Sequence, residues 1–175
     1  MKENFKECLD IILKHEGGFV NHPKDPGGAT NLGVTKRTLE KFLGKEVSVD
    51  DVKNLTKETA GEIYKQRYWD SLKGDDLPSG VDLSLFDWGV NSGPARAAKS
   101  LQKILSVSAD GIIGNQTLAA LVGCPLPLIL ERIHESRKKF YESLKTFETF
   151  GKGWLRRNDE TLSEAKRLLH WSEKV

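Results

Sequence analysis

Apolar residues recur at intervals of three and four along almost the whole chain, and this spacing constrains the fold more than any other feature. Phe5, Cys8, Leu9 and Ile12 show the pattern first, on one face of a helix. Similar spacing indicates further helices near residues 36–43, 56–68, 83–90, 94–105, 117–122, 126–147 and 159–171. The strongest interruption is residues 19–34, which are rich in glycine and proline. We therefore predict a mainly α fold, with a short hairpin or loop after the first helix.

Several residues mark where these helices begin and end. Thr35, Ser48 and Thr56 precede apolar helical runs, where their hydroxyl groups can cap a helix N-terminus. Gly44 can close the helix that Thr35 opens. Pro94 suits the first turn of a helix, because proline needs no backbone donor there.

The composition is that of an ordinary globular protein. The 175 residues suffice for one domain with a sizeable core, or for a small domain plus a subdomain. No segment approaches the roughly 18 apolar residues that a membrane span needs, so we expect no stable membrane insertion. Residues 1–5 lack an apolar signal core, which predicts synthesis in the cytoplasm without a signal peptide.

The cysteine and histidine patterns give no sign of a metal or redox site. Cys8 and Cys124 form no Cys-x-x-Cys pair, and we expect both to be reduced thiols in the core. The four histidines do not have the spacing of a zinc motif. We therefore expect no metal and no cofactor.

Charge is distributed unevenly along the chain. Residues 1–92 hold 13 basic and 16 acidic residues, whereas residues 93–175 hold 14 basic and 9 acidic residues. The basic excess of the second half favours an anionic partner. The alternative is that single clusters such as Arg137-Lys138-Lys139 are solvated faces of amphipathic helices. The formal net charge is only +2, and we expect no nucleic-acid partner.

Glu16 occupies an unusual position at the end of the first helix. On a helical wheel it falls about 20° from Phe5, in the middle of the apolar stripe. Burial disfavours the charged form of a carboxyl group, so Glu16 is a candidate proton donor. Two structural alternatives stay open, namely that Glu16 lies in a frayed last turn or pairs with a buried arginine.

The loop that follows carries a second carboxylate and a hydroxyl group, Asp25 and Thr30. Glycines on both sides of Asp25 let the backbone approach a bulky ligand closely. Two carboxylates that flank a bond, one as acid and one able to activate water, are what glycoside hydrolysis requires.

Four blocks of the sequence stand out, namely "HEGGFVNHPKDPGGATNLGVTKRTL", "IYKQRYWDSLKGDDLPSGVDLSLFDWGVNSGPARAAKSLQ", "DGIIGNQTLAAL" and "FETFGKGWLRRN". In this order they resemble glycoside hydrolase family 108, the N-acetylmuramidases of phage endolysins and related bacterial lysis or release proteins. The resemblance implies a lysozyme-like fold that cuts peptidoglycan between N-acetylmuramic acid and N-acetylglucosamine, with Glu16 as general acid. Phage-type lysozymes place an Asp nine positions after this Glu and a Thr six further. Glu16 and Asp25 keep the nine, whereas Thr30 follows Asp25 by five.

The second half is similar to the peptidoglycan-binding segment that accompanies this family, and its "ADGIIGNQT" resembles a turn of wall-binding modules. We therefore expect a catalytic part, residues 1–92, and a helical peptidoglycan-binding part, residues 93–175. Because no linker separates them, we expect the two parts to pack into one compact unit. We also expect a monomer that binds peptidoglycan glycan strands and reaches the wall after holin-type or other dedicated release.

Five side chains are candidate contacts for the glycan, each with a structural alternative. The two aromatic rings can stack on sugars or belong to the core. The buried aspartate can line a cleft or be satisfied by an arginine or backbone donors. The asparagine at the end of its helix can bind an N-acetyl group or cap the helix. The candidates are Tyr68, Trp88, Asn31, Asp87 and Asn91.

Three functions remain open from the sequence. The first is hydrolysis of the glycan strand, with Glu16 protonating the bridging oxygen and Asp25, with Thr30, positioning water or stabilising positive charge. The second is a lytic transglycosylase that gives 1,6-anhydro products. The third is a non-catalytic wall-binding module, which the presence of Glu16 disfavours.

Overall fold

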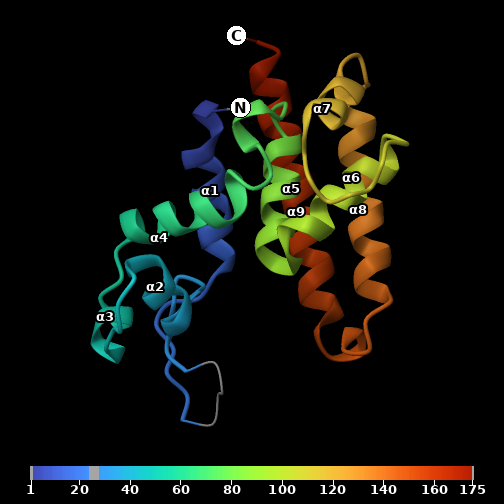
Figure 1. Ribbon diagram of the computed structural model, residues 1–175. Helices are drawn as coiled ribbons and strands as arrows, with labels where there is room; N and C mark the ends of the chain where they lie inside the picture. Colours follow the sequence, from blue (N-terminus) through green and yellow to red (C-terminus); the bar gives the residue numbers. More distant parts are fainter. Residues whose placement is uncertain (1, 24–27, 175) are drawn as a thin grey trace. The chain divides into compact units, whose positions relative to one another are not determined.

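The computed structural model describes residues 2–23 and 28–174, and within them the chain forms two compact units. The hairpin unit is Lys6–Arg67, drawn from blue to blue-green in Figure 1. The bundle unit comprises the described residues of 1–5 and 68–175. The expected mainly α architecture with a small hairpin is confirmed.

The hairpin unit holds short helices and the two strands of a small antiparallel sheet. Its elements are α1 (Phe5–His15, whose first residue belongs to the bundle unit), β1 (Thr30–Asn31), β2 (Val34–Thr35), α2 (Lys36–Leu43), α3 (Val49–Lys53) and α4 (Lys57–Tyr64). A π-helical turn, η2 (Lys65–Trp69), follows α4.

The predicted helix caps are confirmed. The Thr35 and Thr56 hydroxyl groups accept hydrogen bonds from backbone N–H groups in the first turns of α2 and α4, both at 3.2 Å. Ser48 forms a reciprocal capping box with Asp51 at the start of α3. Gly44 ends α2 in the left-handed conformation, with φ of 69°. These features depend on neighbouring residues alone, which explains why the sequence predicts them well.

The hairpin turns through Leu32 and Gly33, both with positive φ, at 50° and 74°. Two consecutive left-handed residues define a type I′ turn, which matches the natural twist of a two-residue hairpin. Thr30 also exchanges two backbone hydrogen bonds of 2.8 Å with Val20. The segment after α1 therefore pairs with the hairpin at Val20. This pairing lies within residues 19–34, where the sequence predicted a short hairpin or loop.

The bundle unit is built around α5. Its elements are η1 (Lys2–Asn4), η3 (Gly74–Asp76), α5 (Val81–Ser92), α6 (Pro94–Ile104), α7 (Asn115–Leu121), α8 (Leu126–Glu142) and α9 (Phe147–Ser172). Every residue of α5 from Val81 to Gly89 is buried, and α5 contacts α6, α8 and α9 (Figure 1). This helix, placed in residues 1–92 by the sequence analysis, thus lies in one compact unit with residues 93–174.

The boundary between the last two helices differs from the prediction. We expected helices at 126–147 and 159–171, but α8 ends at Glu142 and α9 already begins at Phe147. The sequence "GKG" at residues 151–153 lies within α9. In the structure Gly151 is buried within α9, where a Cβ atom would come 2.5 Å from the Phe147 ring. Close ring packing, rather than a turn, explains this glycine.

Among the described residues, no single helix is both long and apolar enough to cross a membrane. The pair α7 and α8 meets the length and composition criteria only when joined across a bend of 119°.

Candidate active site

Glu16 lies directly after the last residue of α1, His15, and is half-buried. The inner face of α1 buries Cys8, Leu9, Ile11 and Ile12, and this stripe leads up to Glu16 as the wheel predicts. Gly17 and Gly18 follow in exposed positions, where a Cβ atom would meet nothing within 4 Å. The chain can therefore turn away immediately after the carboxylate.

The hairpin turn approaches the Glu16 carboxylate closely. A Cβ atom at Gly33 would lie 2.9 Å from Glu16 Oε2 and would overlap the Tyr64 hydroxyl group. The Tyr64 hydroxyl donates a hydrogen bond of 2.9 Å to the Leu32 carbonyl oxygen. Tyr64, at the end of α4, thus stabilises the turn through this hydrogen bond. Because Gly33 has no side chain, its backbone can lie close to the Glu16 carboxylate.

The residues beside the turn form hydrogen bonds with other parts of the protein. Asn31 is 7% exposed, and its amide nitrogen donates to the carbonyl oxygens of Val52 and Lys53, both at 3.0 Å. The Asn31 donors are therefore used at the end of α3, and the glycan contact expected for Asn31 stays a prediction. The backbone of Thr30 pairs with Val20 on one side and Thr35 on the other, which leaves its half-buried side chain as the group for any chemistry.

Asp25, the predicted second carboxylate, lies outside the described residues. Within residues 2–23 and 28–174, no group of three or more His, Cys, Asp or Glu side chains has the arrangement of a metal site.

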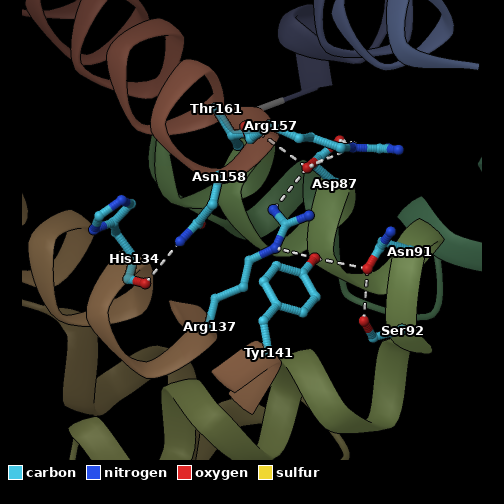
Figure 2. Close-up of polar contacts among 9 residues, drawn as sticks. All are labelled: Asp87, Asn91, Ser92, His134, Arg137, Tyr141, Arg157, Asn158 and Thr161. Atoms are coloured by element: carbon cyan, nitrogen blue, oxygen red, sulfur yellow. Dashed lines mark hydrogen bonds and ion pairs between the residues drawn. The ribbon is translucent and has the colours of Figure 1, made fainter. Parts of the chain in front are cut away.

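Asp87 lies in the bundle unit, fully buried between two arginines (Figure 2). Arg137 Nη1 donates to Asp87 Oδ2 at 2.6 Å, and Arg157 Nη2 donates to Oδ1 at 2.8 Å. The Thr161 hydroxyl adds a bond of 3.0 Å. Asp87 joins α5 to α8 and α9, as in the alternative of a buried carboxylate satisfied by arginine.

The electrostatics of this cluster favour the ionised carboxylate. Burial alone would raise the pKa of the Asp87 carboxyl group. The charges of Arg137 and Arg157, together with their hydrogen bonds, outweigh burial and hold this pKa well below its usual range.

The same cluster extends to the protein surface at Asn91. Arg137 Nε donates to the Tyr141 hydroxyl at 2.8 Å, and this hydroxyl donates to Asn91 Oδ1 at 2.6 Å. The Ser92 hydroxyl donates to the same oxygen at 2.8 Å (Figure 2). Two donors to one oxygen fix the orientation of the amide. The NH₂ group of Asn91 forms no hydrogen bond within the described part of the chain, so it is available as a donor.

The candidate aromatic residues differ in exposure. Trp88 is 1% exposed and packs beside Phe140, with ring centroids 6.3 Å apart. Its position is that of a core residue that lines a cavity of the bundle unit. Tyr68, in the π-helical turn, is half-buried.

Sequence reasoning missed the partners that organise these residues. Gly33 belongs to a turn and Tyr64 to an apolar helix face, with no local sign that Gly33 lies close to both Glu16 and Tyr64. Arg137 belonged to a basic run, and Arg157 lay in a conspicuous block without an assigned role.

Comparisons with known proteins show what the chain as a whole is similar to. The sequence matches the family described as glycosyl hydrolase 108 over residues 9–93, and a predicted peptidoglycan domain over residues 96–159. No curated protein gives a significant match. The solved structure of Brucella abortus SagA has 44% sequence identity, covers 97% of both chains and superposes with a TM-score of 0.86.

These matches define a glycosidase of the peptidoglycan hydrolase class. The chain belongs to the glycosyl hydrolase 108 family and carries the peptidoglycan domain in its second half.

Proposed function

We propose that this peptidoglycan hydrolase is an N-acetylmuramidase that hydrolyses the bond between N-acetylmuramic acid and N-acetylglucosamine, with Glu16 as the general acid. The supporting observation is the position of Glu16, half-buried at the end of α1 and in contact with the hairpin turn. A carboxyl group held against the backbone of a tight turn can be positioned to transfer a proton to a leaving oxygen.

The hairpin gives this carboxyl group its position. Because Leu32 and Gly33 form a tight turn and Tyr64 bonds to the Leu32 carbonyl, the wall beside Glu16 is fixed before substrate arrives. Preorganised groups need no rearrangement when charge develops in the transition state.

The partner of Glu16 in this proposal is Asp25. In its ionised form a second carboxylate can activate a water molecule or stabilise an oxocarbenium-like sugar. Thr30 is the hydroxyl group proposed to assist it. Asn91, with an oriented and available NH₂ group, is proposed to donate to a carbonyl oxygen of an N-acetyl group.

The test is digestion of purified peptidoglycan followed by mass spectrometry of the products. Hydrolysis by an N-acetylmuramidase gives reducing N-acetylmuramic acid ends. Products with 1,6-anhydro ends would identify a lytic transglycosylase, and reducing N-acetylglucosamine ends would place the cut at the other linkage. Either result would contradict the proposal, as would a lack of any soluble product.

A further inference from the structure

A cavity of about 390 Å³ lies in the bundle unit between α6 and α8, with Trp88 of α5 in its wall. Its volume falls within the range of about 300–1,000 Å³ that small-molecule sites occupy. All of its lining residues belong to the bundle unit, so it is built from residues other than Glu16 and the hairpin.

Three basic side chains line this cavity, namely Arg96, Lys99 and Lys103. Their spacing of three and four places them on one face of α6. No acidic residue is among the lining residues that the structure describes. Asp110, which is not among the lining residues, interacts electrostatically with Lys99 and accepts two hydrogen bonds at Oδ1 from a neighbouring side chain and the backbone.

The remaining walls combine aromatic rings with hydroxyl groups. The guanidinium carbon of Arg96 lies over the Phe140 ring, 4.2 Å from its centroid, which restricts the motion of this cation. The Ser100 and Ser136 hydroxyl oxygens are 2.7 Å apart and share one hydrogen bond. Since each hydroxyl group has one hydrogen, the pair still has one to donate. The cavity therefore offers cations and a neutral donor beside apolar surface.

We propose that this cavity binds the acidic peptide stems of peptidoglycan through their carboxylate groups. The inference rests on the proposed function of the chain as a hydrolase of that polymer, and it assigns the peptide portion of the substrate to the bundle unit. The glycan would then be the ligand of the Glu16 region, and the branching peptide the ligand of the cationic cavity.

The chemistry of the polymer supports this assignment. Where the lactyl groups of a glycan strand are amide-linked to peptides, the sugars are neutral and the free carboxylates belong to the peptides. Carboxylates form charge-assisted hydrogen bonds with lysine and arginine, and arginine can bind them with two N–H groups. The aliphatic parts of a peptide can pack on Phe140, which is half-buried.

The test is calorimetric titration of the full chain with N-acetyl-L-alanyl-γ-D-glutamyl-diaminopimelate, a sugar-free stem peptide. We expect saturable binding that weakens as salt is added, because exposed charges are screened. The same peptide with its carboxylates amidated should bind at least about tenfold more weakly, since charge-assisted hydrogen bonds are lost. Equal binding of the two peptides, or no binding of the acidic one, would overturn the inference.

Two double variants of equal charge locate the site. Lys99→Gln with Lys103→Gln should weaken binding of the acidic peptide by about tenfold or more. Lys145→Gln with Lys152→Gln removes the same charge at exposed positions outside the cavity and should leave the affinity within about twofold. Equal losses in both variants would show a non-specific charge effect. Tighter binding of a glycerol phosphate oligomer than of the acidic peptide would identify a different ligand class. Because the peptide has no glycosidic bond, this test succeeds or fails independently of the hydrolysis assay.

Discussion

Glu16 and Gly33 lie so close together that a methyl group on the Gly33 α-carbon would come within 2.9 Å of Glu16 Oε2. The proposed acid thus lies against bare backbone, at the one turn of the hairpin where two consecutive residues have positive φ. This contact predicts that residue 33 controls the position of the carboxylate as well as the conformation of the turn.

Gly33→Ala should therefore lose most glycan hydrolysis as well as stability. Gly44→Ala is the matched control, because Gly44 has a similar φ of 69° but open space around its Cβ position. Left-handed strain alone costs about 1 kcal/mol, so Gly44→Ala should lower stability by that amount and keep turnover. Denaturant unfolding and rates of glycan hydrolysis compare the two. Equal activity in both variants would show that the contact with Glu16 is unimportant.

Tyr64→Phe tests the bond that fastens the turn. The variant keeps the ring but leaves the Leu32 carbonyl oxygen without its hydroxyl donor. Stability should fall by about 1 kcal/mol, the typical value of one hydrogen bond. We expect kcat to fall more than KM rises, because Tyr64 positions the wall beside the acid and is not proposed to bind glycan. A rise in KM at unchanged kcat would contradict this positioning role.

Sequence analysis predicted local features well, but it did not predict contacts between segments that are distant in the chain. Caps at Thr35, Ser48 and Thr56 were predictable because each cap bonds to a residue three positions away. The wheel also predicted that Glu16 continues the apolar stripe of α1. The close approach of Gly33 to Glu16 and to Tyr64 depends on how the hairpin folds back, which no periodicity encodes.

Asp87 shows the same limit in the bundle unit. Its inward position on α5 followed from spacing, and an arginine partner was one of the alternatives. Arg137 and Arg157 lie 50 and 70 residues further along the chain, and the packing of α8 and α9 brings them to Asp87. The predicted start of the last helix was wrong for a related reason. Gly151 leaves room for the Phe147 ring within α9 and does not end a helix.

Glu16→Gln should abolish lysis while the fold survives, because the amide has almost the same shape but cannot donate the required proton. Loss of a general acid typically costs about 10²- to 10⁴-fold in rate. Glu62→Gln, on the exposed face of α4, is the control with the same chemical change and should retain full activity. Rates of hydrolysis of purified peptidoglycan measure the loss of activity, and melting curves show whether the variant is still folded. A folded Glu16→Gln protein with ordinary activity would remove Glu16 from the mechanism.

Asn91→Asp should raise KM for glycan by about tenfold, the effect of losing one hydrogen bond to a neutral group. The aspartate keeps an oxygen that can accept from Tyr141 and Ser92, but it replaces the available NH₂ donor. Gln116→Glu, at an exposed position of α7, makes the same amide-to-carboxylate change as a control. If KM is unchanged in Asn91→Asp, this residue does not contact the glycan.

The ion pairs of Asp87 should make the protein sensitive to acid in a defined direction. The pKa of this carboxyl group lies well below its usual range in the folded protein, because Arg137 and Arg157 outweigh the effect of burial. Between the folded pKa and the ordinary value of about 4, the unfolded chain binds the extra proton, so stability falls as pH falls. The stabilisation is fully present above the ordinary value, and each pH unit below it removes up to about 1.4 kcal/mol from this group. Asp87→Asn has no proton to gain, so the stability difference between wild type and variant should narrow from pH 5 towards pH 2. Denaturant unfolding across this pH range measures the difference in unfolding free energy between wild type and variant. The other carboxylates titrate in both proteins, so their contributions cancel in this difference.

If the stability curves of the two proteins are parallel, Asp87 has the same pKa in the folded and unfolded states.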